Sequence, residues 1–545
     1  MAPGGIGAAH GCERPFGGYH ARMASAEPES IRLGSPADAG PSRPARLMPA
    51  IVGGVALVVY WRTLMPGIAF GDWGEMQTVA HVLGVAHPTG YPTYIVLTWF
   101  AELVPIGSIA FRANLLSAIC VAATLGTVTL ISMRLGVRPI IAGASALALG
   151  AVGTVWAAAT VAEVNPLHLL FVALILHRAL VWEDRRSRSD LVLGGLLVGL
   201  ALGNHLLTLL IAPFVGVFVL WTGRREILAR PSILVPALAA VFLGLAVYLY
   251  IPLAAGQSPP LPYNGPVTLD GLLWLVSGTQ FRGQFDFLSP NGPGEFVAAL
   301  PELGALVAAR ATPILPILGL AGLAILVRRR PAFGLLCAAI LVCGVYVWAN
   351  YLQLEHYLLG PWLLLAIGMS VALEWIAGAV TRRPRRIAAA DDGVLVGSAA
   401  LLFALALGTI NWSASDRSGD RSGQDYVDAV FAALPRDAAI LSNWDGSTPL
   451  WHGRYVQGSR PDVLVVDDTN IVYEQWVTRE RRISSLICRR PVFILRLDDR
   501  DLVPTRQAFR LEPFMTVRVA AGGPSAAVDR PIFRVEPLDP AACGP

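Results

Sequence analysis

The sequence is poor in charge and in cysteine, and it lacks several common binding motifs. Charged residues make up 15% of the 545 residues and hydrophobic residues 54%, a balance typical of membrane proteins. The net charge is only +4, and the arginines form short clusters without interleaved aromatic residues, which argues against nucleic acid as a partner. The chain has neither a phosphate-binding glycine loop nor a metal-binding Cys/His spacing. Among the six cysteines, only Cys488 and Cys543 are candidates for a disulfide.

The first 45 residues are rich in Gly, Pro, Ser and Arg. They lack the basic start, apolar core and cleavage site of a signal peptide. We expect residues 1–45 to form a disordered cytoplasmic tail.

Long apolar runs dominate the rest of the chain. A run of about 20 residues spans the roughly 30 Å hydrocarbon core of a bilayer. By this criterion we predict about eleven crossings. They are residues 48–64, 115–133, 140–156, 167–182, 191–203, 206–221, 233–252, 305–327, 332–351, 358–380 and 394–412.

The connections between these runs alternate in charge, and every second loop carries an arginine cluster. The positive-inside rule places these basic loops in the cytoplasm together with the N-terminus. Loop 66–114 and everything after Trp412 then face outside, and the chain is predicted to be a multi-pass protein of the cell membrane. Residues 91–104 are too short for a span, so we predict an interfacial helix with Tyr94 and Trp99 at the membrane surface.

After Trp412 the composition becomes that of a soluble α/β unit. Short apolar strands beginning at Ala438, Asp462 and Val492 alternate with amphipathic segments, which predicts a small, partly parallel sheet over residues 413–545. Carboxylates follow the first two strands, where α/β sheets often present functional groups. A capping or turn role is the more common one for such residues, here Asp445, Asp467 and Asp468.

The outer loop opens with "GDWGEMQTVAHVLGVAHPTGYP". If this stretch begins with a helix, Asp72 and Glu75 lie on one face of it, and their oxygens converge on a substrate or a cation. In the alternative, Asp72 is the N-cap of that helix and Gly84 its C-terminal stop. Both remain open at this stage. His81 fits a polar surface position, whereas the prolines around His87 make the backbone rigid and fix the direction of its side chain.

Further polar residues collect at the outer ends of the predicted spans. Ionisable groups near membrane depth usually face a bundle interior or a watery cavity. Singly, each of these residues fits a helix cap or an interfacial position. Together they predict one outward-facing cavity, lined by Glu163, Asn165, His168, Asn204, His205, Glu355, His356 and Tyr357.

These motifs resemble the GT-C superfamily of membrane glycosyltransferases. More closely, they resemble a bacterial family long described as a domain of unknown function, whose vertebrate relative is a protein O-mannosyltransferase. The resemblance runs from about Met48 to Pro491. It rests on "GDWGE…LGVAHPTGYP", "RANLLSA", "AEVNPLH", "LGNHL", "ALPRDAAILSNWDGSTPLW" and "RPDVLVVD", which occur in order at compatible spacing.

The resemblance implies a GT-C fold with a polyprenyl-phosphate-linked sugar, such as mannose, as donor. The acceptor would be an exported protein or a glycan, and transfer would invert the anomeric centre. Asp72 would be the base, or would bind a divalent cation (Mg or Mn) together with Glu75, which orients it. The remaining candidate substrate-binding residues are His87, Tyr91, Arg112, Glu163, Asn165, Asn204, His205 and His356. Arg112 and Arg282, as basic residues of outer loops, are candidates to neutralise the phosphate.

Two other classes of protein fit part of the pattern. A transporter or lipid flippase would also present an outward cavity, although transporters tend to carry inverted repeats, and we find no internal repeat. Alternatively, the bundle serves only to anchor the C-terminal domain in the lipid bilayer.

Overall fold

The computed structural model describes residues 43–284, 292–351, 353–381, 392–468, 478–519, 527–539 and 543. Most of the predicted tail therefore lies outside the described residues. The first helix begins at Arg43, and its candidate membrane span runs over Ala45–Thr63.

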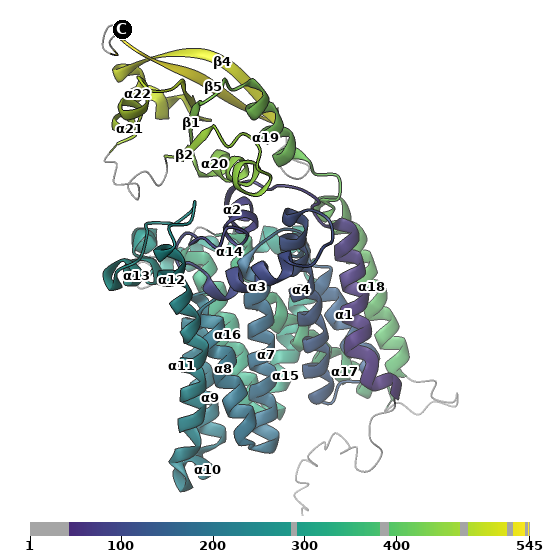
Figure 1. The fold of residues 1–545 in the computed structure, drawn as a ribbon. Helices are drawn as coiled ribbons and strands as arrows, with labels where there is room; N and C mark the ends of the chain where they lie inside the picture. Colours follow the sequence, from purple (N-terminus) through teal and green to yellow (C-terminus); the bar gives the residue numbers. More distant parts are fainter. Residues whose placement is uncertain are drawn as a thin grey trace, which may run out of the picture. The chain divides into compact units, whose positions relative to one another are not determined.

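Among the described residues from Arg43 to Ser415, the regular elements are helices joined by loops (Figure 1). The α-helices are α1 (Arg43–Thr63), α2 (Gly71–Val79), α3 (Pro92–Glu102), α4 (Ile109–Arg134), α5 (Pro139–Gly150), α6 (Gly153–Ala159), α7 (Val164–Arg185), α8 (Arg188–Leu202), α9 (Leu207–Thr222), α10 (Arg224–Ala229), α11 (Leu234–Leu245), α12 (Tyr250–Gly256), α13 (Leu269–Val276), α14 (Gly292–Arg310), α15 (Ile314–Arg329), α16 (Pro331–Asn350), α17 (Leu359–Thr381) and α18 (Asp392–Ser415). Short 3-10 turns η1 (Pro231–Ile233), η2 (Ala246–Leu249), η3 (Thr279–Gln284) and η4 (Glu355–Leu358) adjoin them.

All eleven predicted apolar runs are helical, but two of them are not straight spans. Within the described residues, seven helices are long and apolar enough to cross a membrane, or nine if each bent pair counts as one span. The predicted run 140–156 is divided into α5 and α6 with a 74° bend, and the run 305–327 belongs to α14 and α15, which meet at 110°. Helices α8 and α9, with 15 and 16 residues, are shorter than the usual spanning length.

Small residues allow the helices of the bundle to pack closely. A Cβ on Gly322 of α15 would collide with the carbonyl oxygen of Gly368 in α17, and one on Gly199 of α8 with that of Val241 in α11. Such close packing is the main source of helix association in lipid, where the hydrophobic effect does not drive helices together. The opposite face of α11 leaves large apolar side chains such as Phe242 exposed at 70%, as a lipid-facing surface requires.

Helix α3 confirms a short helix where no span was predicted, but not the position of its aromatic residues. The side chain of Tyr94 is fully buried, so the expectation that it lies at the membrane surface is wrong. Trp99 on the same helix is half-buried. The helix packs Tyr94 against the same apolar cluster that receives α4 and α7.

A five-stranded sheet follows the helical part. Its strands are β1 (Ala439–Ser442), β2 (Leu464–Asp467), β3 (Val492–Leu495), β4 (Phe509–Val519) and β5 (Val528–Pro537), in the order β2-β1-β3-β5-β4. The sheet is accompanied by α19 (Ser422–Ala433), α20 (Trp444–Trp451), the π-helical turn η5 (His452–Val456), α21 (Arg479–Leu486), η7 (Asp499–Leu502) and α22 (Val503–Ala508).

The prediction of a partly parallel sheet is confirmed. Strands β1, β2 and β3 are parallel and correspond to the three predicted runs, whereas β4 and β5 form an antiparallel hairpin that the sequence analysis missed. Cys488, just after α21, forms a disulfide with Cys543. The carboxylates after the strands form ion pairs: Asp445 with Arg530, and Asp468 with Arg479 and Arg496.

The sheet region contacts the loop segment that contains α2 (Figure 1). Gly74 of α2 has no room for a side chain, because a Cβ there would lie 3.0 Å from Thr448 Oγ1 of α20 and would also collide with the carbonyl oxygen of Ala69. In the same way, Gly423 of α19 packs on the carbonyl oxygen of Ile68. The two glycines thus allow α20 and α19 to pack directly on the segment around α2. One apolar cluster contains residues of both the helical region and the sheet region.

Candidate active site

The first acidic residue of the outer loop is not a helix cap. Phe70 is the N-cap residue of α2 and makes no side-chain capping bond, while the helix ends at Val79, well before Gly84. The side chain of Gln77 instead holds the segment that leads into α2, because its Oε1 accepts from the backbone N–H of Ala69 at 2.9 Å. The capping alternative for Asp72 is therefore wrong, and the carboxylate is available for another role.

The second acidic residue, Glu75, is only 1% exposed and binds His87 twice. The backbone N–H of His87 donates to Glu75 Oε1 at 2.9 Å, and His87 Nδ1 forms a short hydrogen bond to Oε2. On the other side of the imidazole, Tyr91 Oη lies 3.1 Å from His87 Nε2 and donates to the carbonyl oxygen of Pro88 at 3.0 Å. Because the phenol proton goes to that carbonyl, the network assigns a proton to Nε2 as well as to Nδ1.

The electrostatics agree with a doubly protonated His87. Burial lowers the pKa of His87, but the carboxylates of Glu75 and Asp72 oppose this effect and raise the pKa to about 9. Near neutral pH the imidazole is therefore a cation held between two acids. A fixed positive charge of this kind suits an anionic ligand.

Asp72 lies on the exposed side of α2, and its partner comes from the sheet region. The indole Nε1–H of Trp444, the first residue of α20, donates to Asp72 Oδ1 at 2.7 Å. Within the part of the chain that the structure describes, Oδ2 of Asp72 receives no hydrogen bond. One carboxylate oxygen is thus fixed in direction, and the other remains available.

A cavity of about 420 Å³ opens beside these residues. It is walled by α2, by the turn before α3, by the starts of α7 and α9, and by η4. Seven of the predicted site residues line it, namely Asp72, His87, Tyr91, Glu163, Asn165, His205 and His356. The structure therefore brings together residues that are up to 284 positions apart in the chain, from Asp72 to His356.

Some predicted site residues do not face this cavity. Glu75 lies behind His87, and Asn204 is fully buried, where its Nδ2 donates to the carbonyl oxygen of Val164 at 3.1 Å. Arg112 donates to three backbone carbonyls, those of Glu102 (2.7 Å), Ile106 (2.8 Å) and Gly107 (3.1 Å). The expectation that Arg112 faces a phosphate does not agree with these contacts, because its guanidinium instead holds the turn between α3 and α4. The side chain of Arg282 lies outside the described residues.

Glu163 has a partly structural role. It is the N-cap of α7, where its Oε1 accepts from the backbone N–H of Val164 and from Asn165 Nδ2, at 3.2 and 2.8 Å. Its Oε2 accepts from Trp73 Nε1 at 2.8 Å. Glu163 thereby ties the start of α7 to α2 at the edge of the cavity.

A second cavity, of about 590 Å³, adjoins the first, and six residues line both: Asp72, Trp73, Glu163, Leu354, His356 and Trp444. Its other walls come from the helical region and from residues after α18, and the latter carry charge, from Arg417, Asp420, Asp445 and Arg530. Arg530 is held by an ion pair to Asp445 at 2.6 Å and lies 4.4 Å from the ring centre of Phe70. Asp72 thus lies on the wall that the two cavities share.

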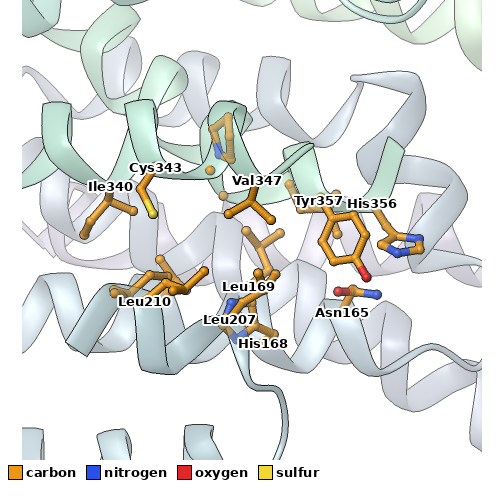
Figure 2. A pocket seen from close by; sticks show the side chains of 16 residues that line it. Asn165, His168, Leu169, Leu207, Leu210, Ile340, Cys343, Val347, His356 and Tyr357 are labelled. Carbon is orange, nitrogen blue, oxygen red and sulfur yellow. The ribbon is translucent and has the colours of Figure 1, made fainter. Parts of the chain in front are cut away.

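A narrow apolar groove of about 40 Å³ continues from the first cavity between α7, α9, α16 and α17 (Figure 2). Asn165, His356 and Tyr357 lie at one end and belong to both spaces, whereas Leu210, Ile340 and Cys343 lie at the other end. The lining therefore changes from polar to apolar along the groove. Such a gradient suits a ligand with an anionic head and a hydrocarbon tail.

The two acids do not fit a cation site shared between them. Both oxygens of Glu75 are engaged by His87, which itself carries a positive charge, so only Asp72 offers a free carboxylate oxygen. Among the residues that the structure describes, no group of three or more His, Cys, Asp or Glu could hold a metal ion. The donor set disagrees with the metal role that the resemblance implied for Glu75.

Sequence reasoning overlooked the aromatic residues of the site. Trp73, Tyr263, Tyr351 and Trp444 line the first cavity, but none was singled out. For Trp444 a signal existed, since "SNWDG" follows the first strand and Asn443 caps the next helix by accepting from the N–H of Gly446 at 3.3 Å. The aspartate of that motif drew attention instead of the tryptophan.

Solved structures with a similar fold belong to GT-C membrane glycosyltransferases. ArnT from Cupriavidus metallidurans bound to undecaprenyl phosphate superposes with a TM-score of 0.55 at 16% identity, covering 89% of this chain and 97% of ArnT. The Archaeoglobus fulgidus oligosaccharyltransferase tethered with an acceptor peptide gives a TM-score of 0.51 at 11% identity, covering 89% of this chain and 74% of that protein. At such identities the likeness concerns the fold, and it confirms the predicted GT-C-like architecture.

Sequence comparison points to a particular group within this class. Residues 72–228 match the family model of the protein O-mannosyl-transferase TMEM260 N-terminal domain. The mouse (Mus musculus) protein O-mannosyl-transferase TMEM260 is 27% identical over 499 residues, which cover 82% of this chain and 67% of the mouse protein. The resemblance seen in the motifs is thereby confirmed, and the chain is homologous to protein O-mannosyl-transferases.

Proposed function

We propose that this protein is a membrane glycosyltransferase that transfers a sugar, with mannose as the first candidate, from a polyprenyl-phosphate carrier to a hydroxyl of an exported protein. The observation that carries the proposal is the position of Asp72. Its free carboxylate oxygen borders a cavity that holds a histidine cation and leads into an apolar groove. Homology to protein O-mannosyl-transferases supports the sugar and the acceptor.

In this proposal the donor occupies the first cavity and the groove. The hydrocarbon chain lies along the apolar side chains of α9 and α16, and the phosphate lies near His87, His205 and His356. The imidazolium of His87 attracts the phosphate and stabilises the charge that grows on it as the sugar leaves. Tyr91, Glu163 and Asn165 line the same space beside the donor.

The reaction then needs one base and good positioning. The acceptor hydroxyl oxygen attacks the anomeric carbon, its proton passes to Asp72 Oδ2, and the bond from that carbon to the phosphate oxygen breaks. Polyprenyl phosphate leaves, and the configuration of the sugar is inverted. Glu75 acts indirectly, because its two bonds to His87 keep the cation in place.

The acceptor approaches from the second cavity in this scheme. That cavity is shared between the helical region and the sheet, and its charged walls suit a polypeptide more than a lipid. Asp72 and Glu75 together do not offer the free oxygens that a shared divalent cation would need, so no step of the reaction is assigned to a cation.

The orientation belongs to the proposal as well. A transferase domain over residues 46–412 spans the cell membrane with a cytoplasmic N-terminus, and the domain over residues 413–545 faces outside. The disulfide between Cys488 and Cys543 supports this, because disulfides persist in oxidising compartments. A membrane-impermeant maleimide, applied to intact cells after reduction, should label Cys488 and Cys543.

The test of the function is a transfer assay. The purified protein is incubated with polyprenyl-phosphate mannose and an acceptor protein carrying exposed serine and threonine. We expect free polyprenyl phosphate to appear together with an added hexose mass on the acceptor. A transporter or a mere anchor would release no polyprenyl phosphate, and the absence of release across mannose, glucose and arabinose donors would refute the proposal.

A further inference from the structure

We infer that Trp444, supplied by the sheet region, is a positioning residue that holds the carboxylate of Asp72 in its reactive orientation. The inference rests on the proposed function and names a residue that completes the site from outside the helical region. The geometry that carries it is the 2.7 Å hydrogen bond from the indole Nε1–H to Asp72 Oδ1.

Asp72 needs such support, since it is exposed and its own helix does not fix it. It makes no capping bond at the start of α2, and among the described residues Trp444 is its one hydrogen-bond partner. An exposed aspartate otherwise samples several rotamers. A base that must meet a hydroxyl proton at hydrogen-bonding distance loses rate when its carboxylate rotates away.

The indole is itself held firmly. Asn443 caps α20 and sets the direction in which its first residue projects, and the contact of Gly74 with Thr448 seats α20 against α2. The ring of Trp444 makes edge contacts with His87, Tyr263 and Trp451, with centroid distances of 5.7, 6.2 and 5.6 Å. An indole offers a donor and no acceptor, so it orients a carboxylate without competing for the proton.

The choice of oxygen is consistent with this role. Trp444 occupies Oδ1, and this leaves Oδ2 for the acceptor hydroxyl. Trp444 also lines both cavities, so the bond is made at the boundary where donor and acceptor would meet. The helical region by itself would keep Asp72 but lose the group that aims it.

The first test separates the hydrogen bond from the ring. Trp444→Phe keeps an aromatic ring and removes the N–H, while Trp375→Phe makes the same change at an exposed residue of α17 that lines neither cavity. In the full-length protein we expect Trp444→Phe to lower kcat about 10-fold or more, the effect of losing a hydrogen bond to a charged group. The KM for the acceptor should match that of Trp375→Phe. Equal kcat values in the two variants would overturn the inference.

A second test does not depend on activity. Melting temperatures are measured for Trp444→Phe, Asp72→Ala and the double variant. If the two side chains interact, the double variant loses less than the sum of the single losses, by about 1 °C or more. Additive losses would refute the contact, whereas an inactive wild-type protein with non-additive losses would refute the transferase and leave the Trp444–Asp72 pair intact.

Discussion

The two acids of "GDWGE" lie within one turn of α2, yet the buried side around Glu75 (the inner face) and the exposed side around Asp72 (the outer face) are built in opposite ways. On the inner face, Glu75 is buried and finds its partner, His87, 12 positions along the chain. On the outer face, Asp72 is exposed and finds its partner, Trp444, 372 positions away. The hydrogen bonds of the inner face come from local residues, and the sheet region adds only a ring contact from Trp444 to His87. The outer face exists only when the two regions of the molecule are docked.

This difference separates a framework from a reactive group. A buried carboxylate with both oxygens bonded is costly to disturb and unsuited to take a proton from a substrate. An exposed carboxylate with one free oxygen contributes little to stability and is well placed for proton transfer. A substitution of Glu75 should therefore lower mainly stability, and a substitution of Asp72 mainly activity.

The largest effect is expected for Asp72→Asn on the outer face. Asparagine keeps an oxygen for the Trp444 N–H but cannot accept the proton, so kcat should fall by about 10²- to 10⁴-fold with little change in melting temperature. The measurement is release of polyprenyl phosphate. Asp425→Asn, at an exposed aspartate of α19, provides the matched control. Activity near that of the control would remove Asp72 from the reaction.

Glu75→Gln on the inner face should cost stability first. The substitution leaves the buried His87 cation without its closest anion, and breaking a buried ion pair typically lowers the free energy of unfolding by about 3 kcal/mol or more. Denaturation of the detergent-solubilised protein measures this, with the exposed Glu302→Gln as control. If Glu75→Gln were as stable as the control, the inner face would not be the framework described here.

The same network predicts a smaller effect of pH on stability. The pKa of His87 is raised to about 9, above the roughly 6.5 of an unfolded histidine. A raised folded-state pKa gives stability that is complete below pH 6.5 and is lost as the pH rises through about 9. The melting temperature should therefore decline across this window, and His87→Gln should flatten the decline.

The buried carboxyl of Glu102 titrates at a lower pH than His87, so the contributions of these two residues to the pH dependence of stability can be separated. Burial raises the pKa of Glu102 on α3 to about 7, opposed by its neighbour His81. Its contribution to stability falls as the pH rises from about 4.5 to 7. A decline above pH 7.5 that persists in His87→Gln would contradict the assignment to His87.

The sequence predicted the parts of the fold that depend on composition and local pattern. Apolar runs marked the helices, and short apolar strands marked the parallel half of the sheet. Two kinds of feature remained hidden. The bends between α5 and α6 and between α14 and α15 occur inside continuous apolar runs, where hydropathy gives no sign of direction. The hairpin β4–β5 has exposed, mixed faces without a clear alternation.

For the candidate active site, residue type predicted well which side chains line the cavity. It predicted poorly what each of them binds. His87, His205 and His356 do meet at one cavity, because polar residues at helix ends on one side of a bundle have few other places to lie. The partner of each residue could not be read from the sequence. Asp72 with Trp444 and Arg112 with three carbonyls are both decided by packing between distant segments.

Arg112 therefore gives the weakest but most discriminating prediction. Its guanidinium donates to the carbonyls of Glu102, Ile106 and Gly107, so Arg112→Gln should loosen the turn before α4 and lower the free energy of unfolding by about 1–3 kcal/mol. The KM for the polyprenyl-phosphate donor should stay within about 2-fold of the wild type, since Arg112 lines neither cavity, whereas a phosphate contact would be worth more. A large rise in donor KM at unchanged stability would return Arg112 to the phosphate site that its charge first indicated. In that case the outer loop would have to move when the donor binds.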